Sequence, residues 1–181
     1  MQPENPPYRR LRPRLARRDD VSDSTAFISL SPGLVSVFDI PGRRGLSHPE
    51  IGRMGMTPQS AWNAAAAGLV ASARTKTGVE FLARPAYVAL GPDAPRGYEV
   101  RGKGATAAAW LAHPRAFSTL RTHFTSVIEP AGELVYFTRD CHELFVFDVG
   151  EDEVAAALGA NGVVRYSLGF PLLLTCDSAM V

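Results

Sequence analysis

The sequence predicts a single α+β domain, in which a largely antiparallel sheet packs against three to four helices. Strand-like runs rich in aromatic and β-branched residues recur along the chain, and helix-like segments with recognisable start signals lie between them. The chain has 181 residues, of which 46% are hydrophobic and 20% are charged, so it can form one substantial core. We expect this domain to cover residues 23–181.

The strongest strand signal lies in residues 133–149. Two apolar runs, 134–137 and 144–147, flank a polar centre at 138–143. Neither run alternates between apolar and polar residues, which is typical of strands covered on both faces in the middle of a sheet. We predict that the two runs form adjacent antiparallel strands joined by a tight connection.

Weaker strand signals occur on both sides of this pair. Residues 25–30 and 34–40 predict a hairpin, because Pro32 and Gly33 between them favour a turn. Pro85 and Pro171 restrict two other segments to sheet edges or bulges, since proline cannot donate a backbone hydrogen bond. The remaining extended segments are expected at 79–90, 98–101, 163–166 and 172–175.

The best-specified helix begins after Thr57. Thr57 suits the N-cap, Pro58 suits the first helical position, and apolar residues recur at helical spacing as far as Ala73. Gly78 is the expected stop. Further short helices are expected at 105–112, after Pro114 and at 154–158.

The first 22 residues are predicted to form a flexible arm, because they contain four prolines and little that could be buried. A solvated tail is the simplest interpretation. The alternative is an electrostatic contact with nucleic acid or an acidic partner, although no aromatic residue lies among the arginines. The arginines concerned are Arg9, Arg10, Arg12, Arg14, Arg17 and Arg18.

A second basic segment lies within the glycine-rich connection at residues 41–56. It contains Arg43, Arg44 and Arg53 among four glycines. Glycines near arginines can hold a phosphate group, but neither of the common glycine-rich phosphate-binding motifs is present. A simple connecting loop is the favoured interpretation.

Overall composition indicates a cytoplasmic protein. The net charge is +1, so no global field favours nucleic acid or a membrane surface. Two cysteines are too few for a disulfide framework and have no zinc-ligand spacing. No signal peptide or membrane-spanning segment is expected, and neither is a metal or another cofactor.

Reactive residue types are concentrated at Asp140, Cys141, His142 and Glu143. A thiol beside an imidazole and carboxylates could supply a nucleophile, a base and an orienting group. In an extended chain, however, consecutive side chains point to opposite faces, so Cys141 and His142 would not meet. We interpret the cluster as a polar turn, and Asp148 after the second strand as a turn former.

Two segments resemble the YtpQ-like bacterial proteins of unknown function. They are GMTPQSAWNAA at residues 55–65 and RDCHELFVFD at residues 139–148. The resemblance implies a cytosolic bacterial α+β protein. It transfers no catalytic residue, because that family has none established.

Three functional hypotheses follow. The leading one is a non-enzymatic binding or regulatory protein that acts through a protein partner, as an immunity or antitoxin protein would. The second is a thiol-dependent hydrolase or transferase that uses Cys141 and His142. The third is nucleic-acid binding through the N-terminal arginines.

Overall fold

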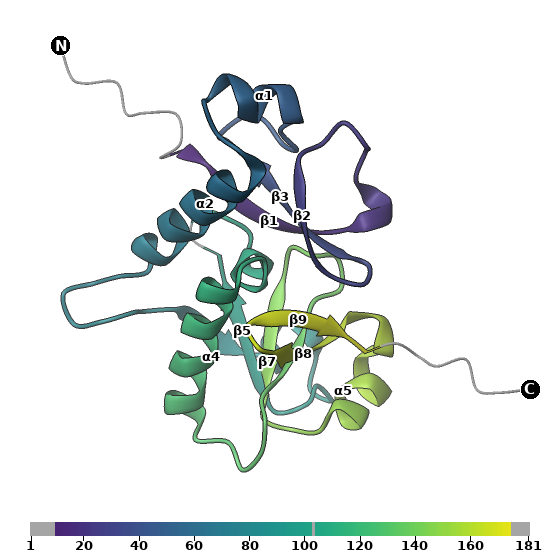
Figure 1. Cartoon of the computed structure of the whole chain (residues 1–181). Helices are drawn as coiled ribbons and strands as arrows, with labels where there is room; N and C mark the ends of the chain where they lie inside the picture. The colour runs from purple at the N-terminus through teal and green to yellow at the C-terminus, as the bar shows by residue number, and fades with distance from the viewer. Residues whose placement is uncertain (1–9, 103, 175–181) are drawn as a thin grey trace, which may run out of the picture.

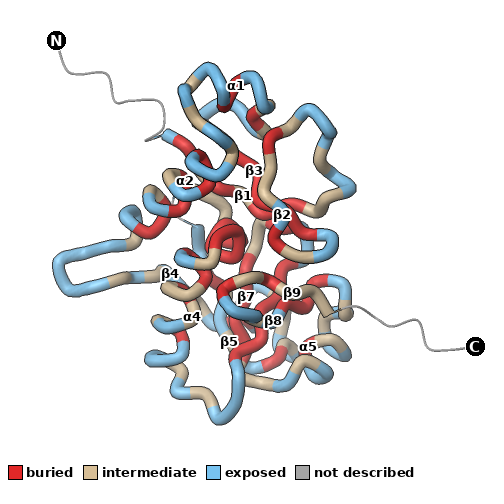
Figure 2. Tube along the Cα trace, viewed as in Figure 1, coloured by how far each residue is buried: buried red, intermediate tan, exposed pale blue. Residues whose placement is uncertain are grey.

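Nine strands form two antiparallel sheets within residues 10–102 and 104–174, which are the residues that this computed structural model describes. One sheet has three strands and the other has six (Figure 1). Helices and both sheets share one buried interior (Figure 2). The predicted single α+β domain with antiparallel pairing is confirmed.

The smaller sheet has the order β1-β3-β2. It consists of β1 (Arg12–Arg17), β2 (Phe27–Ser31) and β3 (Leu34–Asp39). The predicted hairpin is present as β2 and β3, and Gly33 adopts a φ of 77° in the turn between them. Such a left-handed conformation favours glycine.

The flexible arm predicted for residues 1–22 is wrong for residues 12–17, because these residues form β1 and pair with β3 along their whole length. Leu11, Leu15 and Ala16 are buried. Apolar Leu11, Pro13 and Leu15 alternate with arginines, which is the period-two pattern of a strand. Residues 1–9, including Arg9, lie outside the described residues.

The larger sheet has the order β4-β5-β7-β6-β8-β9. The predicted pair is present at its centre as β6 (Val135–Phe137) and β7 (Leu144–Phe147), and every residue of both strands is buried. The apolar runs therefore lack alternation because both sheet faces are covered. The other strands are β4 (Leu82–Pro85), β5 (Gly97–Arg101), β8 (Val163–Ser167) and β9 (Phe170–Leu173).

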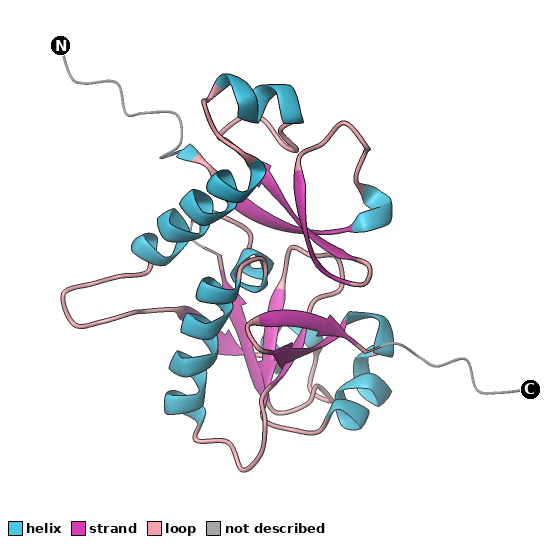
Figure 3. Ribbon diagram, viewed as in Figure 1, coloured by secondary structure: helices cyan, strands magenta, loops and turns pink. Residues whose placement is uncertain are grey.

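The predicted Thr57 helix is α2 (Pro58–Ser72), in which Thr57 Oγ1 accepts a 3.1 Å hydrogen bond from Ser60 N. The predicted stop at Gly78 is wrong, because α2 ends at Ser72 with Ala73 as its C-cap. An isolated bridge between Arg74 and Val79 closes the connection that follows. The predicted alanine-rich helix is the 3₁₀ helix η3 (Ala107–Leu111). The other helices are α1 (His48–Arg53), α3 (Tyr87–Leu90), α4 (Pro114–Ile128), α5 (Glu151–Leu158), η2 (Arg18–Asp20) and η4 (Ala160–Gly162) (Figure 3).

The helices cover the larger sheet on both faces. Phe117 of α4 packs against Tyr136 on one face, in a cluster that extends to α2 and the smaller sheet. Val154 of α5 packs with Phe137 and Phe145 on the opposite face. Within the described residues, every helix is too short or too polar to cross a bilayer.

Candidate functional site

The polar turn between β6 and β7 contains the predicted cluster of reactive residues. Asp140 Oδ1 accepts hydrogen bonds from the backbone N–H groups of His142 at 2.9 Å and Glu143 at 3.3 Å. Burial opposes ionisation of Asp140, but these two hydrogen bonds and the neighbouring His142 bring its pKa below the usual value. Cys141, between Asp140 and His142, adopts a left-handed φ of 62°. The carboxylate therefore organises a tight turn.

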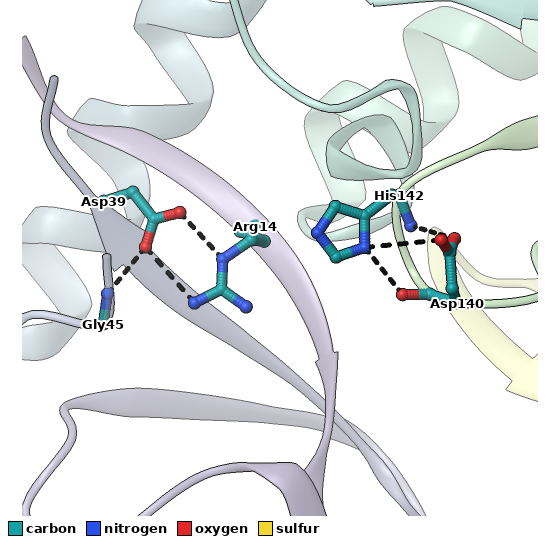
Figure 4. A network of polar contacts seen from close by, with 5 residues as sticks. All are labelled: Arg14, Asp39, Gly45, Asp140 and His142. Atoms are coloured by element: carbon teal, nitrogen blue, oxygen red, sulfur yellow. Dashed lines mark hydrogen bonds and ion pairs between the residues drawn. The ribbon is translucent and has the colours of Figure 1, made fainter. Parts of the chain in front are cut away.

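The thiol of Cys141 points into the protein. Cys141 is buried, and its burial raises the thiol pKa, although Arg17 of β1 opposes this effect. His142 Nδ1 lies 2.8 Å from the carbonyl oxygen of Asp140 (Figure 4). Among the described residues, no hydrogen bond joins the Cys141 thiol to the His142 ring. Activated cysteines have a lowered pKa and an accessible sulfur, and Cys141 has neither.

The N-terminal arginines of β1 and η2 contact the folded domain. Arg14 Nε donates a 2.7 Å hydrogen bond to Asp39 Oδ2, and Asp39 Oδ1 accepts from Gly45 N at 2.8 Å (Figure 4). Arg17 donates to the carbonyl oxygen of Asn161. Arg18 donates to Asp23 at 2.8 Å, whereas Arg10 is exposed.

Two of these arginines and the basic segment after β3 line one cleft of about 840 Å³. We call it the arginine cleft. Its walls are residues 12–14 of β1, residues 39–44 and residues 104–106. The antiparallel pairing of Arg12 with Asp39 brings the first two segments together. The sequence showed two basic segments, but it did not show that they meet.

A second hollow of about 450 Å³ lies at the end of the larger sheet beside β4. We call it the tyrosine groove. The structure places α3 at residues 87–90, where the sequence predicted extended chain, so Tyr87 lines the same hollow as Tyr98 of β5. The residues that define the groove are Pro85, Tyr87, Pro92, Pro95, Tyr98 and Val127.

Exposed apolar side chains distinguish this groove from the turn. Tyr87 is 58% exposed, Tyr98 is 37% exposed and Val127 is 58% exposed. Arg96 and Asp148 also line the groove, and neither side chain has a hydrogen bond or ion pair within the described part of the chain. Asp148 therefore follows the last residue of β7 and also lines this groove. The groove therefore combines exposed apolar side chains with two charged ones.

Among the described residues, no group of three or more histidine, cysteine, aspartate or glutamate side chains is placed to hold a metal ion. Comparison with protein-family models, curated proteins and solved structures finds no match to this chain. The turn, the arginine cleft and the tyrosine groove are thus the features from which function is inferred.

Proposed function

We propose that the chain is a non-enzymatic cytoplasmic binding protein, and that an extended segment of a partner protein docks in the tyrosine groove beside β4. One observation carries this proposal. Among the described residues, three of the six exposed large hydrophobic side chains line this one groove. Clustered exposed apolar side chains mark interaction surfaces. The three are Tyr87, Tyr98 and Val127.

The backbone of β4 supports an extended partner segment. β4 is an edge strand of the larger sheet. Ala86 N donates to Gly97 O at 2.9 Å, so Ala86 and Gly97 form a hydrogen-bonded pair. Together with the register, this pair shows which residues of β4 direct their N–H and C=O groups towards β5. Because hydrogen-bonded pairs recur every second residue, the N–H and C=O groups of Ala83 point away from β5. Such outward groups can pair with an added strand.

The opposite edge of the larger sheet is less available. β9 packs beside β2 of the smaller sheet, and Gly33 lies close to Leu173. The open edge and the exposed tyrosines are therefore both at the β4 end of the molecule. Edge strands that remain uncovered are common sites of strand addition.

Pro85 limits how the partner can bind. It has no N–H, so an added strand can pair with β4 over only a short stretch. Side-chain contacts with Tyr87 and Tyr98 must then supply most of the affinity. Tyrosine suits this role, because its ring buries a large area and its hydroxyl stays hydrated.

Affinity capture with matched variants tests the proposal. The wild-type chain and the Leu168→Ser variant are expected to retain the same protein from native cytosol, because Leu168 is exposed outside the groove. The Tyr87→Ser/Tyr98→Ser variant is expected to lose that protein while keeping its thermal unfolding midpoint. A protein retained equally by all three chains would contradict docking in the groove.

A further inference from the structure

The arginine cleft joins three segments that are distant in sequence. Residues 12–14 come from β1, residues 39–44 follow from the end of β3, and residues 104–106 precede η3. The cleft lies outside the tyrosine groove and shares no lining residue with it. A ligand bound in the cleft would therefore not occupy the tyrosine groove.

Positive charge dominates the lining of this cleft. Four guanidinium groups, those of Arg12, Arg14, Arg43 and Arg44, line it together with a single carboxylate, that of Asp39. No aromatic side chain is part of the lining. The chemistry favours a compact anion over a flat base or an apolar group.

Asp39 holds one of these arginines in a fixed orientation. Arg14 Nε and a terminal nitrogen donate to the two carboxylate oxygens at 2.7 Å and 3.4 Å, and Gly45 N donates to the same carboxylate. Figure 4 shows that the other terminal nitrogen of Arg14 makes none of these contacts. A guanidinium group fixed in this way loses little entropy when it binds an anion.

Two further donors in the cleft have no protein partner within the described residues. Arg44 is exposed and makes no hydrogen bond or ion pair. Thr106 Oγ1 is buried and lacks a hydrogen-bond partner. By contrast, Arg43 is paired with Glu50 at 2.5 Å. Arg44 and Thr106 are therefore donors that a ligand in the cleft can use.

We infer that the arginine cleft binds a compact ligand carrying a diphosphate group. Arg44 and the free terminal nitrogen of Arg14 donate to its phosphate oxygens, and Thr106 Oγ1 donates a further hydrogen bond. The volume of about 840 Å³ leaves room for an organic substituent on the diphosphate. Charge-assisted hydrogen bonds between arginine and phosphate supply the affinity.

Calorimetric titration of the full chain with inorganic pyrophosphate at low ionic strength tests this inference. The Arg44→Gln variant is expected to bind about tenfold more weakly, since it loses a charge-assisted contact. Arg165→Gln removes the same charge from an exposed position on β8 and is expected to bind like the wild type. Both variants should keep the wild-type thermal unfolding midpoint.

Three results would overturn the inference. The first is the absence of pyrophosphate binding at low ionic strength, and the second is equal binding by wild type and Arg44→Gln. The third is tighter binding of a single-stranded oligonucleotide that displaces pyrophosphate and is weakened by Arg44→Gln, because this would assign the cleft to a nucleic-acid backbone. None of these results bears on the tyrosine groove.

Discussion

The indole N–H of Trp62 donates a 2.7 Å hydrogen bond to the carbonyl oxygen of Ala112, which lies fifty residues later in the chain. Both atoms are buried, so this bond connects α2 to the end of η3 without competition from water. His113 extends the contact, because its ring lies 4.3 Å from that of Trp62, measured between ring centroids. Two polar contacts thus join α2 to the connection between η3 and α4: this bond, and the 3.1 Å contact between Asn63 Oδ1 and His113 Nε2.

Replacing Trp62 with Phe should lower the free energy of unfolding. The substitution removes the indole donor and leaves the Ala112 carbonyl oxygen without its partner, at a cost of about 1–3 kcal/mol. Chemical denaturation measures the change. Val88→Ala, at an exposed position, is the control and should alter stability by less than about 0.5 kcal/mol. Equal stability of both variants would contradict this account.

The stability of the protein should fall as pH drops from 6.5 towards 4. Burial, assisted by Arg115, lowers the pKa of His113 from 6.5 to about 4 in the folded protein. Between these values the unfolded chain binds a proton that the folded chain does not, so the free energy of unfolding decreases as the solution becomes more acidic. The full effect is on the order of 3 kcal/mol.

Comparison with His113→Asn isolates this effect. His113 Nδ1 accepts a 3.0 Å hydrogen bond from Arg115 N at the start of α4, and asparagine is also a good N-cap residue. Denaturation curves between pH 5 and pH 7.5 should show a smaller pH dependence in the variant. Parallel pH profiles would show that His113 is not responsible.

Leu15→Ala should destabilise the protein by about 2–5 kcal/mol, because Leu15 is fully buried and its truncation leaves a cavity. Arg10→Ala, at an exposed position five residues earlier, should have an effect near zero. Urea denaturation of both variants measures whether β1 is part of the core. If Leu15→Ala were as stable as Arg10→Ala, the packing of β1 in this structure would be wrong.

The Cys141 thiol should react slowly with an alkylating reagent in the folded protein. Its burial and raised pKa both reduce the concentration of accessible thiolate. In a Cys176→Ser background, mass spectrometry should show at least about tenfold faster modification after denaturation than before it. Rapid alkylation of the native chain would contradict this expectation and would support a thiol-dependent hydrolase or transferase.

The fold was predictable where a pattern among neighbouring residues determines the local structure, as in a buried strand or a helix start. Lack of alternation in residues 134–137 and 144–147 predicted central strands, and Thr57 with Pro58 predicted the start of α2. β1 was not predicted, because its three arginines and its proline indicate an exposed segment when only local composition is considered. Leu15 and Ala16 are nevertheless buried in β1, since the long arginine side chains can extend to the solvent from a strand that is itself partly buried.

The candidate sites were less predictable, because each depends on contacts between distant segments. The arginine cleft requires the register of β1 against β3, and the tyrosine groove requires α3 to place Tyr87 in the same hollow as Tyr98. Neither register nor this placement is specified by neighbouring residues. The local cluster at Asp140, Cys141 and His142 was visible in the sequence, and its interpretation as a polar turn agrees with the observed hydrogen bonds.

Photo-crosslinking in living cells tests the proposed partner docking most directly. A benzoylphenylalanine residue replaces Tyr98 in one chain and Leu168, which is 91% exposed, in a control chain. The account predicts a covalent adduct with a second protein from position 98, its loss when Tyr87→Ser is added, and no such adduct from position 168. Equal adducts from both positions, no adduct from position 98, or an adduct only with another copy of this chain would contradict it.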